Sequence, residues 1–165
     1  MNVDLTRRES GFSAVEVTVV MLIIGILVAI SLPAMSNSIS KYNLRNAANH
    51  IAERLSYARG VAMEKNRDVG VTIRRDGEYG FDFDADGTID TVDPDDPTQT
   101  YFSLSLPDFV SIPSSFFPPD KDYILIRFNS RGELPIGDPE ANVEVQGSSG
   151  SVRLRVNLRG KVWVS

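Results

Sequence analysis

A long apolar stretch with one acidic residue at its head constrains this chain more than any other feature. Between Val17 and Ser40 no residue carries a charge, and the stretch is bounded by Glu16 on one side and Lys41 on the other. About 20 apolar residues are enough to cross a bilayer as a helix. A charge in hydrocarbon costs roughly 2.5 to 3.5 kcal/mol on insertion scales, so a carboxylate at this position indicates a function.

The residues around the stretch predict its orientation. Arg7 and Arg8 precede it, and the positive-inside rule then places the N-terminus in the cytoplasm and the rest of the chain outside. The apolar run is too long for the core of an ordinary secretory signal, and no A-x-A-like cleavage site closes it. An uncleaved single-pass anchor with an outer domain is one interpretation, but it gives Glu16 no purpose.

Composition argues against an enzyme and against general nucleic-acid binding. The 165 residues include one histidine and no cysteine, so no disulfide or thiolate metal site exists. No serine stands in a nucleophile elbow and no glycine loop is built to hold a phosphate. The net charge of −5 disfavours binding of nucleic acid over the whole surface, although a local basic patch is compatible with it.

A helical pattern continues beyond the apolar stretch. Apolar residues recur at alternating steps of four and three, which predicts an amphipathic helix that packs on the chain's own sheet, with a coiled coil as the alternative. The helix should end near Lys65–Asp68, and Pro33 should kink it or melt it locally. The stripe consists of Leu44, Ala48, Ile51, Leu55, Ala58 and Ala62.

After Asn66 short alternating runs separated by turns predict antiparallel β-structure. Asp76-Gly77 is a hairpin signal, and the last three runs read as a meander. The fold class is therefore α+β, with a long N-terminal helix packed against an antiparallel sheet or sandwich. The expected strands are 69–73, 79–83, 101–106, 110–112, 123–128, 142–146, 152–157 and 161–165.

Gly11-Phe12, followed by Glu16 and by an apolar helix containing Pro33, resembles the processing site and stalk of the type IV pilin superfamily. The resemblance implies that a prepilin peptidase cuts after Gly11 and methylates the new amine of Phe12. It also implies roles for Phe12, Glu16 and Pro33 in assembly. The implied organisation is a leader over 1–11, a transmembrane and assembly helix over 12–40, an amphipathic helix over 41–66 and a β head over 67–165.

The physical chemistry of Glu16 agrees with that resemblance. After cleavage the chain would begin with a cation at Phe12, and the new amine of a neighbouring subunit could pair with Glu16 in the apolar core of a filament. An unpaired buried charge is strongly unfavourable, so the pair would fix the axial register between subunits. The alternative is a Glu16 side chain that reaches the membrane surface.

Two segments of the head resemble the GspH/FimT-like branch of the superfamily, the H-type minor pseudopilins and their minor pilin relatives. They are Phe128–Glu133 and Val156–Val162. The resemblance implies a structural minor pseudopilin of type II secretion, single-pass in the bacterial inner membrane, with its head in the periplasm or on a surface filament. Implied partners are other pilins or pseudopilins, the prepilin peptidase and an inner-membrane assembly platform. The alternative is a minor type IV pilin that primes pili or takes up DNA.

Aspartates alternate between Asp82 and Asp93 with the ligand spacing of an EF-hand calcium loop, and a glycine stands sixth. Strands rather than helices flank the loop, and the twelfth position lacks the bidentate glutamate. A structural calcium ion and a solvated acidic turn are the two interpretations, and the absence of Lys and Arg between Arg75 and Lys121 favours calcium. No other cofactor is expected. The candidate ligands are Asp82, Asp84, Asp86, Thr88, Asp90 and Asp93.

The C-terminal strands are basic. Some relatives in the superfamily bind DNA with this segment, which implies salt-sensitive phosphate contacts here. Two of the arginines share a strand face, and the favoured interpretation is a solvated outer face rather than a DNA site. The candidate DNA-binding residues are Arg153, Arg155, Arg159 and Lys161.

Overall fold

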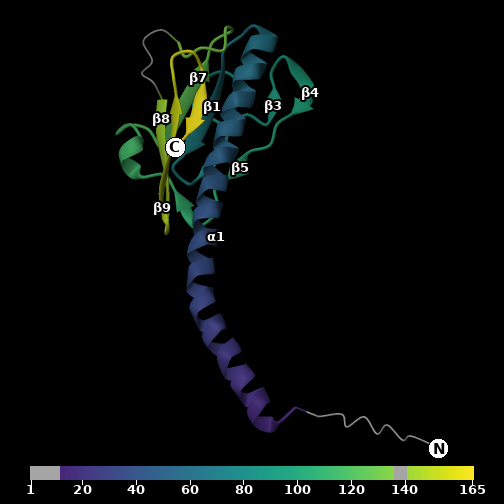
Figure 1. The fold of residues 1–165 in the computed structure, drawn as a ribbon. Coiled ribbons are helices and arrows are strands. Elements are labelled where there is room, and N and C mark those ends of the chain that lie inside the picture. Colours follow the sequence, from purple (N-terminus) through teal and green to yellow (C-terminus); the bar gives the residue numbers. More distant parts are fainter. Residues whose placement is uncertain (1–11, 136–140) are drawn as a thin grey trace, which may run out of the picture. The chain divides into compact units, whose positions relative to one another are not determined.

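One long helix precedes a set of short antiparallel strands (Figure 1). The computed structural model describes residues 12–135 and 141–165, and at 31–34 it describes the backbone alone. Helix α1 spans Ala14–Lys65 and so ends where the sequence predicts. The chain divides into two compact units, of which the first ends at Ser38 and the second, the head unit, spans Ile39–Ser165.

The first sheet of the head unit has the strand order β5-β2-β1-β7, and every neighbouring pair is antiparallel. β1 and β2 form the predicted hairpin around Asp76-Gly77, where the Gly77 N–H donates to the carbonyl oxygen of Arg74 at 3.1 Å. In chain order the strands are β1 (Val69–Arg74), β2 (Glu78–Asp82), β5 (Leu104–Ser105) and β7 (Tyr123–Phe128).

The second sheet has the order β10-β9-β8-β6 and is also antiparallel, so its last three strands form the predicted meander. Its strands are β6 (Val110–Ser111), β8 (Ala141–Gly147), β9 (Gly150–Val156) and β10 (Val162–Val164). A separate hairpin pairs β3 (Val92–Asp93) with β4 (Asp96–Thr100). The short 3-10 helix η1 covers Ser114–Phe116.

The core of the head unit lies between α1 and both sheets. All six residues of the predicted apolar stripe on α1 are buried, with exposed fractions of 3% or less. They belong to one hydrophobic cluster with side chains from β1, β2, β7, β8 and β9. The amphipathic part of α1 therefore packs on the chain's own sheets rather than in a coiled coil, which confirms the α+β class.

Two expectations need correction, and one hairpin was not predicted. The backbone at Pro33 is helical, so the helix does not melt there; the Pro33 side chain lies outside the described residues. The strand predicted over 101–106 shrinks to β5, because Tyr101 turns into an aromatic cluster with Phe81 and Phe83, at ring-centroid distances of 4.7 and 5.3 Å. The β3–β4 hairpin was not expected, since proline and aspartate disfavour strands.

Candidate functional site

The start of α1 is built around a helix cap. The backbone N–H of Val15 donates to the Ser13 hydroxyl at 3.3 Å, and Glu16 lies in the first turn. Ser13 is therefore the N-cap residue, and Glu16 at the third helical position lies where an acidic side chain favours the positive end of the helix dipole. The S-x-x-E pattern was present in the sequence, and this second role of Glu16 was missed.

Glu16 is nevertheless exposed in an apolar setting. It lines one side of the helix start together with Phe12, Val20 and Ile24. Among the residues that the structure describes, the Glu16 carboxylate has no hydrogen bond or ion pair. Gly11, the other predicted processing residue, lies outside the described residues. A carboxylate in this position is able to accept a charged partner, and the described residues do not supply one.

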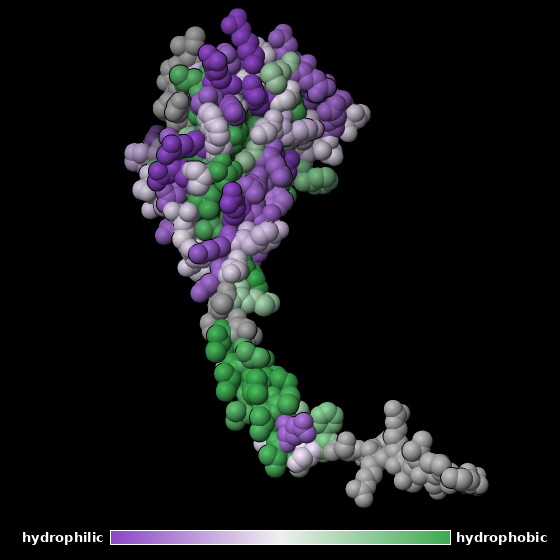
Figure 2. All heavy atoms as spheres, in the orientation of Figure 1, coloured by the Kyte–Doolittle hydropathy of each residue, from purple (hydrophilic) through white to green (hydrophobic). Residues whose placement is uncertain are grey.

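The part of α1 that follows Glu16, as far as residue 30, is apolar and exposed. One helix of the described chain, α1, contains an 18-residue window long and apolar enough to cross a membrane, and none of that window is buried. Figure 2 shows the corresponding part of the helix as almost uniformly hydrophobic, whereas hydrophilic side chains dominate the surface of the head unit. Length and composition therefore fit a membrane anchor.

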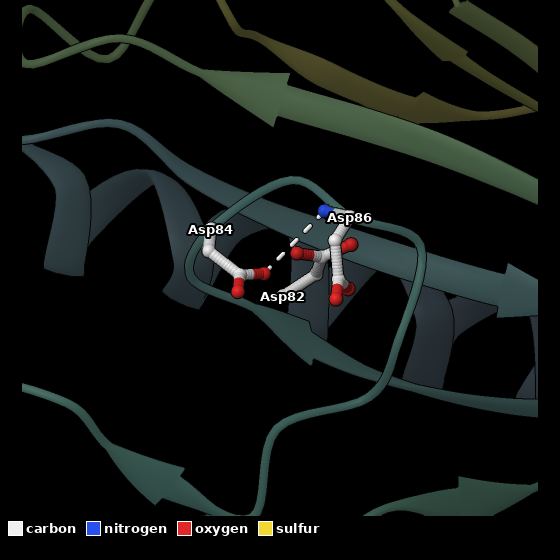
Figure 3. Close-up of side chains that lie close together, drawn as sticks. All are labelled: Asp82, Asp84 and Asp86. Carbon is white, nitrogen blue, oxygen red and sulfur yellow. Dashed lines mark hydrogen bonds between the residues drawn. The ribbon is translucent and has the colours of Figure 1, made fainter.

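Three of the predicted calcium ligands come together after β2. Carboxylate oxygens of Asp82, Asp84 and Asp86 lie within 4.8 Å of one another (Figure 3). Gly87 turns the loop with a φ of +89°, and a Cβ atom there would overlap the Tyr123 ring. The glycine at the sixth position is thus required by the loop itself, whether or not a cation is bound.

The oxygens of this loop are partly engaged by protein donors. Asp82 is fully buried and accepts hydrogen bonds from the Thr72 hydroxyl at 2.7 Å and from two loop N–H groups. One oxygen of Asp86 accepts both the N–H and the hydroxyl of Thr88, at 2.7 and 2.6 Å. Asp84 accepts a long hydrogen bond of 3.4 Å from the Asp86 N–H. Asp84 and Asp86 consequently retain free coordinating oxygens.

Asp90 lies beside this group and responds to its charge. Its carboxylate accepts the Phe83 N–H at 2.7 Å. Burial, followed by the negative charges of Asp84, Asp82 and Asp86, raises the pKa of Asp90 above its ordinary value. A negative potential that a cation would relieve is therefore concentrated at this loop.

Asp93, the sixth predicted ligand, is committed elsewhere. It is fully buried and pairs with Lys65 at 2.6 Å and with Arg67 at 2.5 Å, while Arg67 also reaches Asp95. Burial works to raise the pKa of Asp93, but the hydrogen bonds from Lys65 and the Asp95 N–H and the charge of Arg67 outweigh it and lower the pKa. The structure thus gathers three candidate ligands with Asp90 beside them, and it places Asp93 in an ion-pair cluster that fastens the end of α1 to β3.

The basic C-terminal residues have different partners in the structure. Arg153 pairs with Glu144 at 2.8 Å, whereas Arg155 lies opposite the exposed Trp163 in the β9–β10 pairing. Lys161 lies over the Trp163 ring, with 5.3 Å between Nζ and the ring centroid. Trp163 was not singled out in the sequence, although an aromatic residue among arginines is a recognisable feature of anion-binding surfaces.

A head of two antiparallel sheets packed on an amphipathic helix, which continues from an exposed apolar helix, defines a pilin-like protein. The family model of the type II transport protein GspH matches residues 47–160. That match covers more than half of the chain, and the chain belongs to the GspH family. Membership gives it a minor pseudopilin or minor pilin role, which is structural rather than catalytic and involves other pilin-like subunits. A search of the curated proteins gives no significant match.

Solved structures agree with this fold. The type IV minor pilin FimU of Pseudomonas aeruginosa superposes with a TM-score of 0.55 at 16% identity, over 76% of this chain and 90% of FimU. The minor pseudopilin EpsH of the type 2 secretion system of Vibrio cholerae gives a TM-score of 0.52 at 14% identity, over 74% of this chain and 96% of EpsH. At these identities the likeness concerns the fold, which is shared by pilus and secretion proteins.

Proposed function

We propose that this protein is a processed subunit of a pilus-like filament, held in the inner membrane by the apolar part of α1 before assembly. The observation that carries the proposal is Glu16, which has no ion pair among the described residues, on an exposed apolar helix in a chain with a GspH-family head. Pairing of Glu16 with the amine of Phe12 on a neighbouring subunit would neutralise both charges, and it would set the axial register as helices leave the lipid. The head would face the periplasm or the filament surface.

Processing is tested by the N-terminus of the protein recovered from membranes. We expect mass spectrometry to find a mature chain that begins at a methylated Phe12, and we expect Gly11→Val to keep the preceding residues attached, because the branched side chain would crowd the cleavage site. Recovery of a wild-type chain that still carries the residues before Phe12 would restore the uncleaved-anchor interpretation.

We favour a type II secretion filament over a type IV pilus because the matched family model is that of a type II transport protein. The likeness to FimU supports the alternative, a minor type IV pilin that primes pili or takes up DNA. The two differ in the filament that takes up the chain, so an epitope-labelled subunit would be found either in surface pili sheared from cells or with the secretion apparatus. The peptidase and the assembly platform are partners in both cases.

We further propose that the loop from Asp82 to Asp90 binds calcium weakly. Three clustered carboxylates support binding, whereas the engaged oxygens of Asp82 and the displaced Asp93 limit its strength. We expect a dissociation constant of about 1 mM, so 10 mM calcium should stabilise the head by about 1.4 kcal/mol. A thermal-unfolding titration measures this. Asp84→Asn should abolish the calcium-induced shift in melting temperature, and Asp76→Asn, which lies outside the loop, should preserve it. A wild-type melting temperature that does not change with calcium would show that the loop is not a calcium site.

A further inference from the structure

An exposed phenylalanine stands at the tip of a tight turn in the head unit. The Val110 N–H donates to the carbonyl oxygen of Pro107 at 2.8 Å, which closes a turn of four residues. Phe109 occupies its third position, where glycine and small polar residues are usual, and it is 51% exposed. Leu106 and Val110 belong to the hydrophobic core, whereas Phe109 is not part of that cluster among the described residues. The ring is therefore available to a second apolar environment.

The turn that carries Phe109 lies against the first residues of α1 in the head unit. Phe109 lines a groove together with Asn43 and Ala47 of α1. Gly147, at the end of β8, gives a second measure of this position. A Cβ atom added there would lie 3.3 Å from the Phe109 carbonyl oxygen and 3.4 Å from a methyl carbon of Leu44. Both observations place the turn beside the part of α1 that directly follows the apolar stretch.

This part of α1 carries the residue types that flank membrane-spanning helices. Lys41 and Arg45 are exposed, and at four residues apart they lie on one side of the helix. Tyr42 is 70% exposed. Between Met35 and Asn49 the charged residues are Lys41 and Arg45, and both are positive. Tyrosine and basic residues just beyond an apolar stretch are typical of the boundary between a membrane and water.

The exposed residues around this part of α1 combine aromatic rings with positive charge. We call Lys41, Tyr42, Arg45 and Phe109 the entry surface. Asp108, next to Phe109 in the turn, is exposed and negative, so two cations against one carboxylate leave the surface positive. At the edge of a bilayer an aromatic ring can bury apolar area while a neighbouring cation contacts lipid phosphates. The entry surface has the composition that this boundary requires.

We propose that the entry surface docks the head on the anionic bilayer that holds the apolar part of α1. Lys41 and Arg45 would contact lipid phosphates, and Phe109 would enter the edge of the hydrocarbon. Continuity identifies the bilayer, because Lys41 is the first charged residue after Glu16 and the surface begins where a membrane-length stretch ends. The inference rests on the membrane anchor of the proposed function. It adds a contact of the head that must break when the subunit leaves the lipid.

Fluorescence quenching in vesicles tests the contact in the full-length chain. Trp163→Phe removes the native signal, and Phe109→Trp introduces a reporter that keeps an aromatic ring at the tip of the turn. The vesicles mix phosphatidylcholine with anionic phosphatidylglycerol, and their acyl chains carry bromine, which quenches tryptophan at close contact. We expect strong quenching of this reporter. Tyr42→Trp is a second reporter on the same surface, with the same expectation, for use if circular dichroism shows that Phe109→Trp does not fold.

The matched control places the reporter at Phe102, another exposed ring of the head. Phe102 is 74% exposed, and its carbonyl oxygen accepts a hydrogen bond from Arg54 at 3.1 Å. Arg54 lies about 14 Å beyond Arg45 along α1, at a rise of about 1.5 Å per residue. Because Phe102 is held at that distance from the entry surface, Phe102→Trp in the same background should show little quenching by bromine.

Neutral variants then measure the contribution of charge. Lys41→Gln with Arg45→Gln should lower the ratio of docked to free heads about fivefold for each charge removed. Vesicles of phosphatidylcholine alone should lower the ratio for the unaltered surface in the same direction. Arg159→Gln with Lys161→Gln removes equal charge from a turn that packs on Arg59, farther along α1, and it should leave the quenching unchanged.

Each outcome supports or overturns the contact. An unquenched reporter at Phe109, or quenching that is equally strong without phosphatidylglycerol, would overturn the proposal. A reporter shielded from water but insensitive to bromine, and increasingly so at higher protein density, would indicate a protein partner, and the proposal would be wrong. Flotation separates the two levels of the argument. A chain that floats with vesicles but stays unquenched loses only the docking of its head, whereas a chain that does not float loses its membrane anchor as well.

Discussion

Glu16→Gln should leave the chain in the membrane in normal amounts and exclude it from filaments. Glutamine has nearly the same shape and Ser13 still caps the helix, so the start of α1 should keep its structure. It has no negative charge to offer the amine of Phe12. Loss of a single charge pair in an apolar environment, taken as at least about 1.4 kcal/mol, lowers incorporation about tenfold. The measurement is the ratio of tagged variant to wild-type subunit in filaments from cells that express both.

Ser13→Ala is the matched control for this experiment. It removes the hydroxyl that caps the helix at a cost of about 1 kcal/mol and leaves the carboxylate of Glu16 in place. We expect the Ser13→Ala chain to enter filaments nearly as well as wild type. Equal incorporation of Glu16→Gln and wild type in the competition would show that Glu16 only favours the positive end of its own helix dipole or reaches the membrane surface. The charge-pair account of assembly would then be abandoned.

Asp93→Asn should produce the largest loss of stability among single changes of charge in the head. The substitution leaves Lys65 and Arg67 beside a neutral amide; their side chains are 18% and 20% exposed. Breaking a buried pair costs about 3 to 5 kcal/mol. Partial exposure of the cations, and the remaining Asp95 partner of Arg67, reduce our expectation to about 2 to 3 kcal/mol. The change in the free energy of unfolding is measured by urea unfolding of the detergent-solubilised chain. The signal is the fluorescence of its only tryptophan, Trp163.

Asp95→Asn is the control, because Asp95 contacts the same Arg67 but is 66% exposed. Surface pairs of this kind are worth at most about 1 kcal/mol. If Asp93→Asn loses no more stability than Asp95→Asn, the ion-pair cluster does not hold the end of α1 to β3 as its geometry indicates.

The effect of Asp93 also has a defined pH dependence. Its pKa is lower in the folded than in the unfolded chain, so between the two values the unfolded state binds more protons. The stabilisation is therefore complete above the unfolded pKa of about 3.9 and is lost as the pH falls through the folded pKa. Wild type and Asp93→Asn should differ most near neutral pH and converge in acid.

Local patterns in the sequence were sufficient for much of the fold. The stripe from Leu44 to Ala62 predicted the buried face of α1, because apolar side chains at helical spacing can be covered only on one side. Alternation predicted β1, β7 and the β8–β10 meander for the corresponding reason in strands. Weak patterns failed where contacts distant in sequence decide, as in the β3–β4 hairpin, which is held by Lys65 and Arg67 through Asp93.

For the candidate sites, too, features that depend on neighbouring residues were predictable and contacts between distant residues were not. The sequence was sufficient to predict the position of Glu16 before an apolar helix and the spacing of the aspartates after β2, because both depend on residues close together in the chain. The ion-pair and hydrogen-bond partners of those residues could not be predicted from the sequence. Calcium spacing includes Asp93 as an equal ligand, yet folding turns Asp93 toward the end of α1. Likewise, the four C-terminal cations formed one predicted set, and the structure pairs Arg153 with Glu144 while it leaves Arg155 beside Trp163.

By itself, the sequence determined that this protein has an apolar helix with a lone carboxylate at its head, an amphipathic continuation and an antiparallel head, because hydrophobic periodicity is a local property of the chain. The tertiary structure alone decided which strands are neighbours and which aspartate is neutralised. Those outcomes depend on which surfaces meet when the core closes, and distances between residues far apart in sequence are set only at that point.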